Sequence, residues 1–230
     1  KHREVAKQAV RESLVLIKNH DSILPLAKNS KVIVDGEFAD SSGLQSGGWT
    51  VDWQGRTDNY DGATTILEGM HRTSTTEIVY DPAGTGEYEG DIAVIIVGET
   101  PYAEFFGDIG GEMDAYEHTL TKKHQEYIKT YAEKGIKVVV VLICGRPLVT
   151  TPQIDLSDAF IVAWLPGSEG DGIAEVLYGD YDFKGKLPHS WPKCVEDYEN
   201  KYGPNFWDDS IDPLFPLGYG LNYSENTNRK

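Results

Sequence analysis

The stretch "DIAVIIVGETPYAEFFGD", residues 91–108, decides the fold of this chain. Its first part is a continuous apolar run that ends in glycine, which is typical of a β-strand covered on both faces. The stretches "IKVVVVLICG" (residues 136–145) and "AFIVAWLPG" (residues 159–167) repeat this pattern. Such runs occur in parallel sheets between two layers of helices. We therefore expect three buried central strands.

Helical patterns alternate with these strands. Residues 121–135 are amphipathic and end at a C-capping glycine, and residues 64–73 form a shorter amphipathic stretch. Residues 170–180 predict a further short helix with Asp171 as its N-cap. Alternating strands and helices are typical of α/β domains. We predict a three-layer α/β/α sandwich with a mostly parallel sheet.

The outer parts of the chain complete this prediction. Residues 3–19 carry apolar side chains at helical spacing and predict one N-terminal helix, and residues 31–36 and 77–82 predict short strands. After Gly179 the chain is rich in Pro, Gly and aromatics, which predicts an irregular tail with a possible antiparallel edge strand. We find no internal repeat, and we predict a single domain over residues 1–230.

Composition limits the classes of function. The chain has 37 Asp and Glu against 21 Lys and Arg, a formal net charge of −16. Nucleic-acid binding needs clustered Lys and Arg, so this balance argues against a nucleic-acid partner and against an anionic membrane surface. No apolar run approaches the roughly 18 residues of a membrane span. A neutral substrate fits the charge best.

Several chemistries lack their sequence signals. Cys144 and Cys194 do not make a disulfide framework, and Cys144, at the end of an apolar run, is expected to be a buried free thiol. The six histidines show no metal-ligand spacing, and neither a phosphate-binding loop nor a G-x-S-x-G elbow is present. We expect no metal site and no cofactor.

The acidic loop, residues 99–108, follows the first central strand, and parallel sheets bind ligands at the carboxyl ends of their strands. Its candidate general acids are Glu99, Glu104 and Asp108. Tyr102, Phe105 and Phe106 flank Glu104, and apolar surroundings raise a carboxyl pKa, so we favour Glu104 as the acid. Glu99, directly after the strand, is expected to bind backbone amides. The alternative is that all three acids are solvated or cap helices.

The tryptophan loop, residues 37–55, holds Trp49 and Trp53 among glycines. An indole face is a good platform for the apolar face of a sugar ring, and the alternative is that both rings pack in the core. Arg146, in "CGRPL", follows another central strand. It either reaches the same cleft or pairs with an acid, and we favour the structural pairing.

Six stretches in order carry a resemblance: "AVRESLVLIKN", "ADSSGLQSGGWTVDWQG", "VGETPYAEFFGD", "CGRPLV", "AWLPGSEGDGIAEVLYGDYDFKGKLPHSWP" and "DPLFPLGYGL". Over nearly its whole length the chain resembles the second, α/β sandwich domain of glycoside hydrolase family 3, in the exo-β-glucanase and β-glucosidase branch. In that family a preceding barrel domain supplies the nucleophilic aspartate. The second glutamate of G-E-x-P-Y-x-E is the general acid/base, which by motif match is Glu104.

The resemblance also implies that Trp53, supported by Trp49, faces the sugar, with Glu99, Tyr102, Asp108 and Arg146 as supporting candidates. It implies a retaining mechanism without metal or cofactor, a β-linked glucan or gluco-oligosaccharide substrate, and a secreted or periplasmic location. The chain opens on Lys1 without Met and contains no barrel sequence, so we expect a piece of a longer, two-domain enzyme. Alone it is predicted to be inactive.

Two other hypotheses stay open. The first is a non-catalytic carbohydrate-binding or scaffolding domain that keeps the tryptophan loop. The second is a nucleotide-binding α/β domain, which the missing phosphate loop and the negative charge disfavour. The sequence does not distinguish linkage preference, or glucose from xylose.

Overall fold

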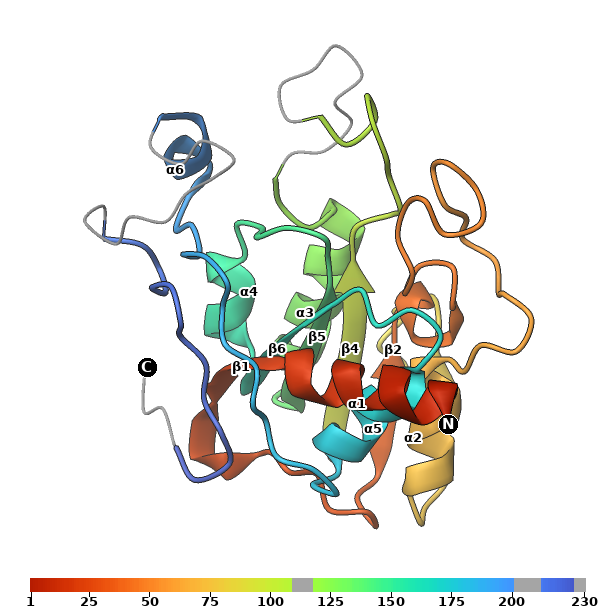
Figure 1. The fold of residues 1–230 in the computed structure, drawn as a ribbon. Coiled ribbons are helices and arrows are strands. Elements are labelled where there is room, and N and C mark those ends of the chain that lie inside the picture. The colour runs from red at the N-terminus through yellow and green to blue at the C-terminus, as the bar shows by residue number, and fades with distance from the viewer. Residues whose placement is uncertain (109–117, 201–211, 226–230) are drawn as a thin grey trace.

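The computed structural model describes residues 1–108, 118–200 and 212–225. Its strands form one six-stranded sheet in the order β1-β6-β5-β4-β2-β3 (Figure 1). Their bounds are β1 (Val15–Asn19), β2 (Val32–Asp35), β3 (Val79–Asp81), β4 (Ile92–Gly98), β5 (Lys137–Ile143) and β6 (Ala159–Trp164). Every pairing is parallel except that of β1 with β6. The predicted mostly parallel sheet is confirmed.

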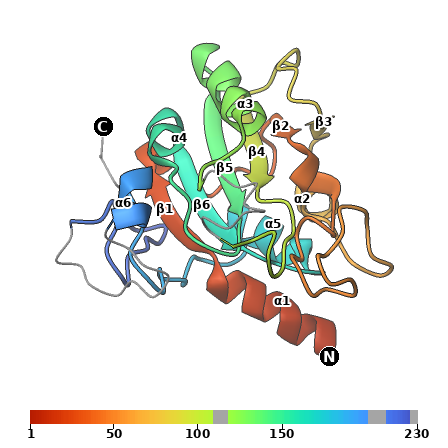
Figure 2. The ribbon, with the colours of Figure 1, turned by 90° about the horizontal axis from the view of Figure 1, so that it is seen from above.

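Helices cover both faces of the sheet. The described helices are α1 (His2–Ser13), α2 (Ile66–Thr73), α3 (Lys122–Glu133), α4 (Thr151–Leu156), α5 (Gly170–Leu177) and α6 (Val195–Asn200), with short 3₁₀ turns η1 (His20–Ser22) and η2 (Glu37–Asp40). Figure 2 shows α1, α2 and α5 on one face and α3 and α4 on the other. The three-layer α/β/α sandwich is therefore confirmed. None of the described helices is long and apolar enough to cross a membrane.

Strand β4 shows why the central strands are apolar at every position. Every second residue from Ile92 to Ile96 belongs to the core under α1, α2 and α5. The residues between and after them, Ala93, Ile95 and Val97, belong to the core under α3 and α4. Because successive side chains point to opposite faces, a strand between two helical layers needs apolar residues throughout. The same alternation runs through β5.

Side-chain caps begin two of the helices, and of the two caps predicted from the sequence, Gly135 is confirmed and Asp171 is not. Thr65 forms a capping box with Glu68 at the start of α2, and the Thr121 hydroxyl accepts the His124 N–H at the start of α3. Gly135, with φ +71°, follows α3. The prediction for Asp171 is wrong, because it lies in the first turn of α5 after the N-cap Glu169 and binds Arg72 at 2.9 Å instead.

The N-terminal segment corrects the sequence prediction. Helix α1 ends at Ser13, Leu14 is extended, and β1 pairs antiparallel with β6. The expected edge strand thus comes from the start of the chain, and the described part of the tail makes only isolated bridges, such as that of Leu16 with Leu221. Residues 14–17 are at most 2% exposed, so burial at the sheet edge overrides the helical spacing.

Candidate active site

The carboxyl ends of β2, β4 and β5 meet at the upper edge of the sheet in Figure 1. Strand β2 leads into the tryptophan loop, which begins with η2, whereas β4 leads into the acidic loop and β5 leads to Arg146. Parallel pairing of these strands therefore gathers three segments that are far apart in the sequence.

Trp53 and Glu104 are in direct contact. The indole Nε1–H of Trp53 donates a hydrogen bond to Oε2 of Glu104 at 2.5 Å. The Trp53 ring also lies edge-on to Phe105 and near Trp49, with centroid distances of 6.2 and 6.5 Å. Trp49 and Trp53 are 68% and 45% exposed, so the alternative of core packing is wrong for both. The structure thus brings the predicted sugar platform to the predicted acid.

The electrostatics of Glu104 differ from the expectation. Its carboxylate is exposed, and the Trp53 N–H holds the pKa of Glu104 below its ordinary value. Phe105 and Phe106 are 57% and 40% exposed and do not keep water from it. The expected raised pKa is therefore wrong for this chain by itself, because desolvation needs a cover that these rings do not provide.

The two loops also touch through their backbones. The side-chain amide of Gln54 accepts the Ala103 N–H at 2.7 Å and donates to the Glu104 carbonyl at 3.2 Å. A Cβ on Gly48 would lie 2.0 Å from the Tyr102 carbonyl oxygen, so only glycine allows this approach. The sequence reasoning missed Gln54, whose only signal was its place next to Trp53.

The buried Glu99 and the half-buried Arg146 form an ion pair at the base of the acidic loop. Arg146 Nε lies 2.9 Å from Glu99 Oε1, and the Gly145 N–H and the Tyr102 hydroxyl also donate to Glu99. Burial raises the pKa of Glu99, while Arg146 opposes that rise. Arg146 also donates to the Gly107 carbonyl at 2.7 Å, so it joins the two ends of the loop. The structural pairing predicted for Arg146 and the amide contact predicted for Glu99 are confirmed.

Tyr102 and Asp108 differ in burial and in what they contact. The Tyr102 ring is half-buried under the Arg146 guanidinium, 4.4 Å from its centroid. Asp108 is exposed at the end of the described loop. Tyr102 therefore supports the loop, and Asp108 takes no part in the contact between Trp53 and Glu104.

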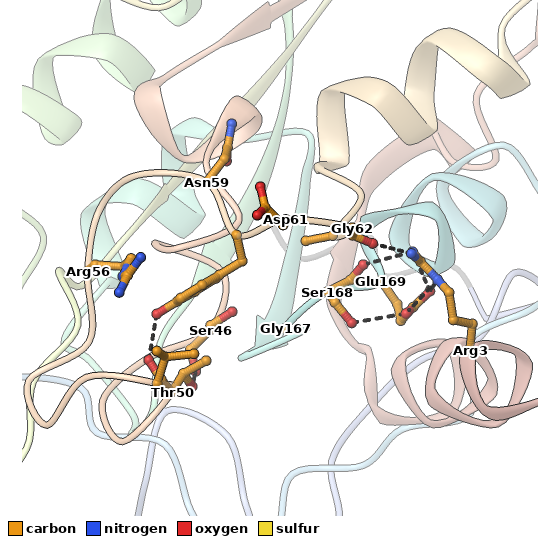
Figure 3. Close-up of a pocket in the computed structure, with 13 residues that line it drawn as sticks. Arg3, Ser46, Thr50, Arg56, Asn59, Asp61, Gly62, Gly167, Ser168 and Glu169 are labelled. Carbon is orange, nitrogen blue, oxygen red and sulfur yellow. Dashed lines mark hydrogen bonds and ion pairs between the residues drawn. The ribbon is translucent and has the colours of Figure 1, made fainter.

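A pocket of about 710 Å³ lies between the tryptophan loop, which contributes Ser46 and Thr50, and a group that includes Arg3 and Glu169 (Figure 3). Its polar groups bind one another: Arg3 donates to Glu169 and Thr64, and the Tyr60 hydroxyl donates to the Thr50 carbonyl. These bonds join α1 to the loops and engage Arg3 and Glu169 in a structural contact. We therefore place the candidate active site at Trp53 and Glu104.

A second group of titratable residues lies inside the same sheet edge. Asp35, fully buried at the end of β2, is paired in register with Asp81 on β3. Burial, together with the Asp81 charge, raises the pKa of Asp35 to about 7. The Tyr131 hydroxyl lies 3.4 Å from Asp81. Sequence reasoning did not single out this pair.

The remaining expectations concern thiols and metals. Cys144 is buried and free, as predicted, and Cys194 is free and exposed. In residues 1–108, 118–200 and 212–225, no three His, Cys, Asp or Glu side chains are arranged to hold a metal ion. The glycine-rich stretch after Asp108 lies outside the described residues.

Comparison with known families and proteins gives consistent matches. The model of the glycosyl hydrolase family 3 C-terminal domain matches residues 14–223. A lysosomal beta glucosidase of Dictyostelium discoideum is 31% identical over 96% of this chain and 30% of its own length. A periplasmic beta-glucosidase of Salmonella typhimurium is 30% identical over 98% of this chain and 35% of its own length.

Solved structures agree. The exo-1,3/1,4-beta-glucanase ExoP of a Pseudoalteromonas species matches with a TM-score of 0.87 and 40% identity, over 100% of this chain and 29% of its own. A beta-glucosidase of Listeria innocua matches with a TM-score of 0.75 and 27% identity, over 94% of this chain and 33% of its own. The chain thus spans about a third of the length of these proteins.

Proposed function

Because the chain belongs to glycoside hydrolase family 3, as its C-terminal domain, we propose that it bears the general acid/base of a retaining, exo-acting β-glucosidase or exo-β-glucanase. The observation that carries the proposal is the contact between the Trp53 indole and the Glu104 carboxylate. It sets a flat apolar ring beside an ionisable group that is open to a ligand. Sugar binding and proton transfer need this combination.

The mechanism uses two carboxylates. One, supplied by the barrel domain, attacks the anomeric carbon while Glu104 protonates the departing glycosidic oxygen. Water then releases the sugar from the covalent intermediate, with Glu104 acting as base. The Trp53 N–H orients the Glu104 carboxylate, and its ring face supports the sugar at the outer subsite, with Trp49 beside it.

The lowered pKa of Glu104 in this chain is consistent with a general acid whose pKa rises only when the barrel domain and a sugar cover it. A carboxylate that accepts an indole N–H in open water is ionised near neutral pH. A barrel and a bound sugar lying over Trp53 and Glu104 would remove that water and raise the pKa, because desolvation disfavours the charged form. Phe105 and Phe106, which follow Glu104 and are exposed, give such a domain an apolar surface to contact.

The names of the relatives support the proposed substrate and location. The matched proteins are named beta-glucosidases and an exo-1,3/1,4-beta-glucanase, which supports a β-linked glucan or gluco-oligosaccharide as substrate. We propose that residues 1–230 form one domain that acts with an N-terminal barrel of the same protein. The lysosomal and periplasmic names of two relatives support a secreted or periplasmic location.

Glu104→Gln in the full-length enzyme, meaning this chain together with its barrel, tests the proposal. The value of kcat/KM for phenyl β-glucoside, a poor leaving group, should fall by about 10²–10⁴-fold, as expected when a general acid is lost. For dinitrophenyl β-glucoside, which leaves without protonation, it should change by less than about threefold. Asp108→Asn, an exposed acid of the same loop, is the matched control and should change neither value.

A non-catalytic carbohydrate-binding domain is the second candidate, and the exposure of both indoles favours it. In that case Glu104→Gln leaves hydrolysis unchanged. Trp53→Ala then dominates, with a large loss of oligosaccharide binding by titration calorimetry. Leaving-group dependence in Glu104→Gln excludes this candidate.

A further inference from the structure

We infer that Gln54 is a positioning residue that holds Glu104 in place for proton transfer, an inference that rests on the proposed function. The Gln54 amide bonds the two peptide groups on either side of the Ala103–Glu104 peptide, accepting from the Ala103 N–H and donating to the Glu104 carbonyl. A planar amide engaged at both ends fixes the orientation of the backbone that carries the Glu104 side chain.

Gln54 acts together with its neighbour. Trp53 binds the Glu104 carboxylate, while Gln54 binds the Glu104 backbone. Two adjacent residues of the tryptophan loop therefore bind Glu104, one at its carboxylate and the other at its backbone carbonyl. The sugar platform and the acid are fixed relative to each other, so a sugar stacked on Trp53 meets Glu104 at a set distance.

The backbone next to this contact is strained and needs support. Phe105, directly after Glu104, has φ +72°, which is unfavourable for an aromatic residue. The carbonyl that Gln54 binds belongs to the peptide joining Glu104 to Phe105. Without that bond the peptide can relax, which would turn the Glu104 side chain away from its place. A displacement of about 1 Å at a reacting group is enough to lower the rate about a hundredfold.

Gln54 lies outside both hydrophobic cores and is only half-buried. Its loss should therefore leave the fold intact and act through Glu104. Structural and positioning roles differ in a measurable way. A structural defect lowers activity on every substrate equally, whereas a misplaced acid affects only substrates whose leaving group needs a proton.

The experiment compares Gln54→Ala with the parent in the full-length enzyme. We expect kcat/KM for phenyl β-glucoside to fall about 10- to 100-fold, while that for dinitrophenyl β-glucoside changes by less than about threefold. Gln54→Glu keeps the acceptor for Ala103 but loses the donor to Glu104, so its loss should be intermediate. Its added negative charge should also move the basic limb of the kcat/KM profile to higher pH. Gln8→Ala, a glutamine of α1 that binds Glu12, is the control and should match the parent.

A double-mutant cycle completes the test. If Gln54 acts through Glu104, then Gln54→Ala should change kcat/KM by less than about twofold in a Glu104→Ala background. An undiminished effect in that background, or an equal loss on both substrates, overturns the positioning role. If Glu104→Gln loses activity mainly on phenyl β-glucoside but Gln54→Ala does not, this inference alone is overturned. If Glu104→Gln itself shows no difference between the two substrates, the proposed function is overturned and the inference with it.

Discussion

Two glutamates of the acidic loop lie in opposite environments although they are five positions apart. Glu99 is 7% exposed, with its pKa raised by burial, and Glu104 is exposed, with its pKa lowered by the Trp53 N–H. The acid with the raised pKa is thus the one held by Arg146 in a structural role. Under the proposed function, the buried Glu99 supports the site, and the exposed Glu104 is the group that a second domain would cover.

Arg146→Met tests the structural ion pair. It leaves Glu99 buried without its cation, so we expect the free energy of unfolding to fall by about 3–5 kcal/mol at pH 8. The loss should shrink toward pH 5, because protonation of Glu99 removes the buried charge. Urea unfolding at both pH values measures this.

The double variant Glu99→Gln/Arg146→Met should recover most of that stability, because no buried charge remains. Lys129→Met, on the surface of α3, is the control and should change unfolding by less than about 0.5 kcal/mol. A pH-independent loss in Arg146→Met would contradict the account.

Asp35 gives the fold a pH dependence of its own. Its pKa is about 7 in the folded state, above the ordinary value of 3.8, so the folded state keeps the proton to higher pH. Its contribution to stability is therefore complete below pH 3.8 and is lost as the pH rises through 7. Asp35→Asn should be more stable than the parent at pH 8 by about 2–4 kcal/mol, with the difference nearly gone at pH 4.

Urea unfolding of Asp35→Asn and the parent across this range measures the difference. Glu126→Gln, an exposed acid of α3, is the control and should follow the parent at every pH. A constant offset between Asp35→Asn and the parent would mean that Asp35 keeps one protonation state throughout.

At the level of single residues, the sequence predicted which residues lie at the candidate site better than it predicted their solvent exposure and pKa. The place of their segments after strands singled out the two loops and Arg146, and the flanking rings and the family motif then selected Glu104 and Trp53. The pKa of Glu104 was not predictable, because adjacent rings in the sequence can point into solvent. Gln54 had no signal of its own, since its role depends on a loop about 50 positions away.

Among the secondary-structure elements, the buried parallel strands were the most predictable, because two-sided burial requires apolar runs, and such runs fill β4 and β6 and the part of β5 after Lys137. Strand β1 was not, since its apolar residues continue the spacing of α1 and only pairing with β6 makes them extended. Helix α4 has six residues, too few for a helical pattern to show.

Gly48→Ala tests the fit between the tryptophan loop and the acidic loop. Its φ is not in the left-handed region, so the added methyl acts through its clash with the Tyr102 carbonyl. We expect the loops to separate, with a loss of kcat/KM on phenyl β-glucoside of about tenfold or more in the full-length enzyme. Gly135→Asn, at an open left-handed position, should leave activity unchanged, and normal activity in Gly48→Ala would show that the loops can shift without harm.

For the molecule as a whole, half of the catalytic pair is expected to come from outside this chain. The described site offers an exposed acid and a platform, and a retaining mechanism needs a second carboxylate about 5 Å from the first. The isolated chain should therefore hydrolyse aryl β-glucosides no faster than a Glu104→Gln version of itself. Ordinary turnover by residues 1–230 alone, measured by release of nitrophenol, would contradict this.

The bridge between Leu16 and Leu221 has a consequence for biosynthesis. Strand β1 is made early, yet its outer edge is covered only when the far end of the domain leaves the ribosome. Until then the outer edge of β1 has unpaired backbone groups, and strands of other nascent chains can pair with it. A chain ending at residue 211 should thus be made in normal amounts but accumulate in inclusion bodies, whereas a chain ending at residue 225 should stay in the supernatant.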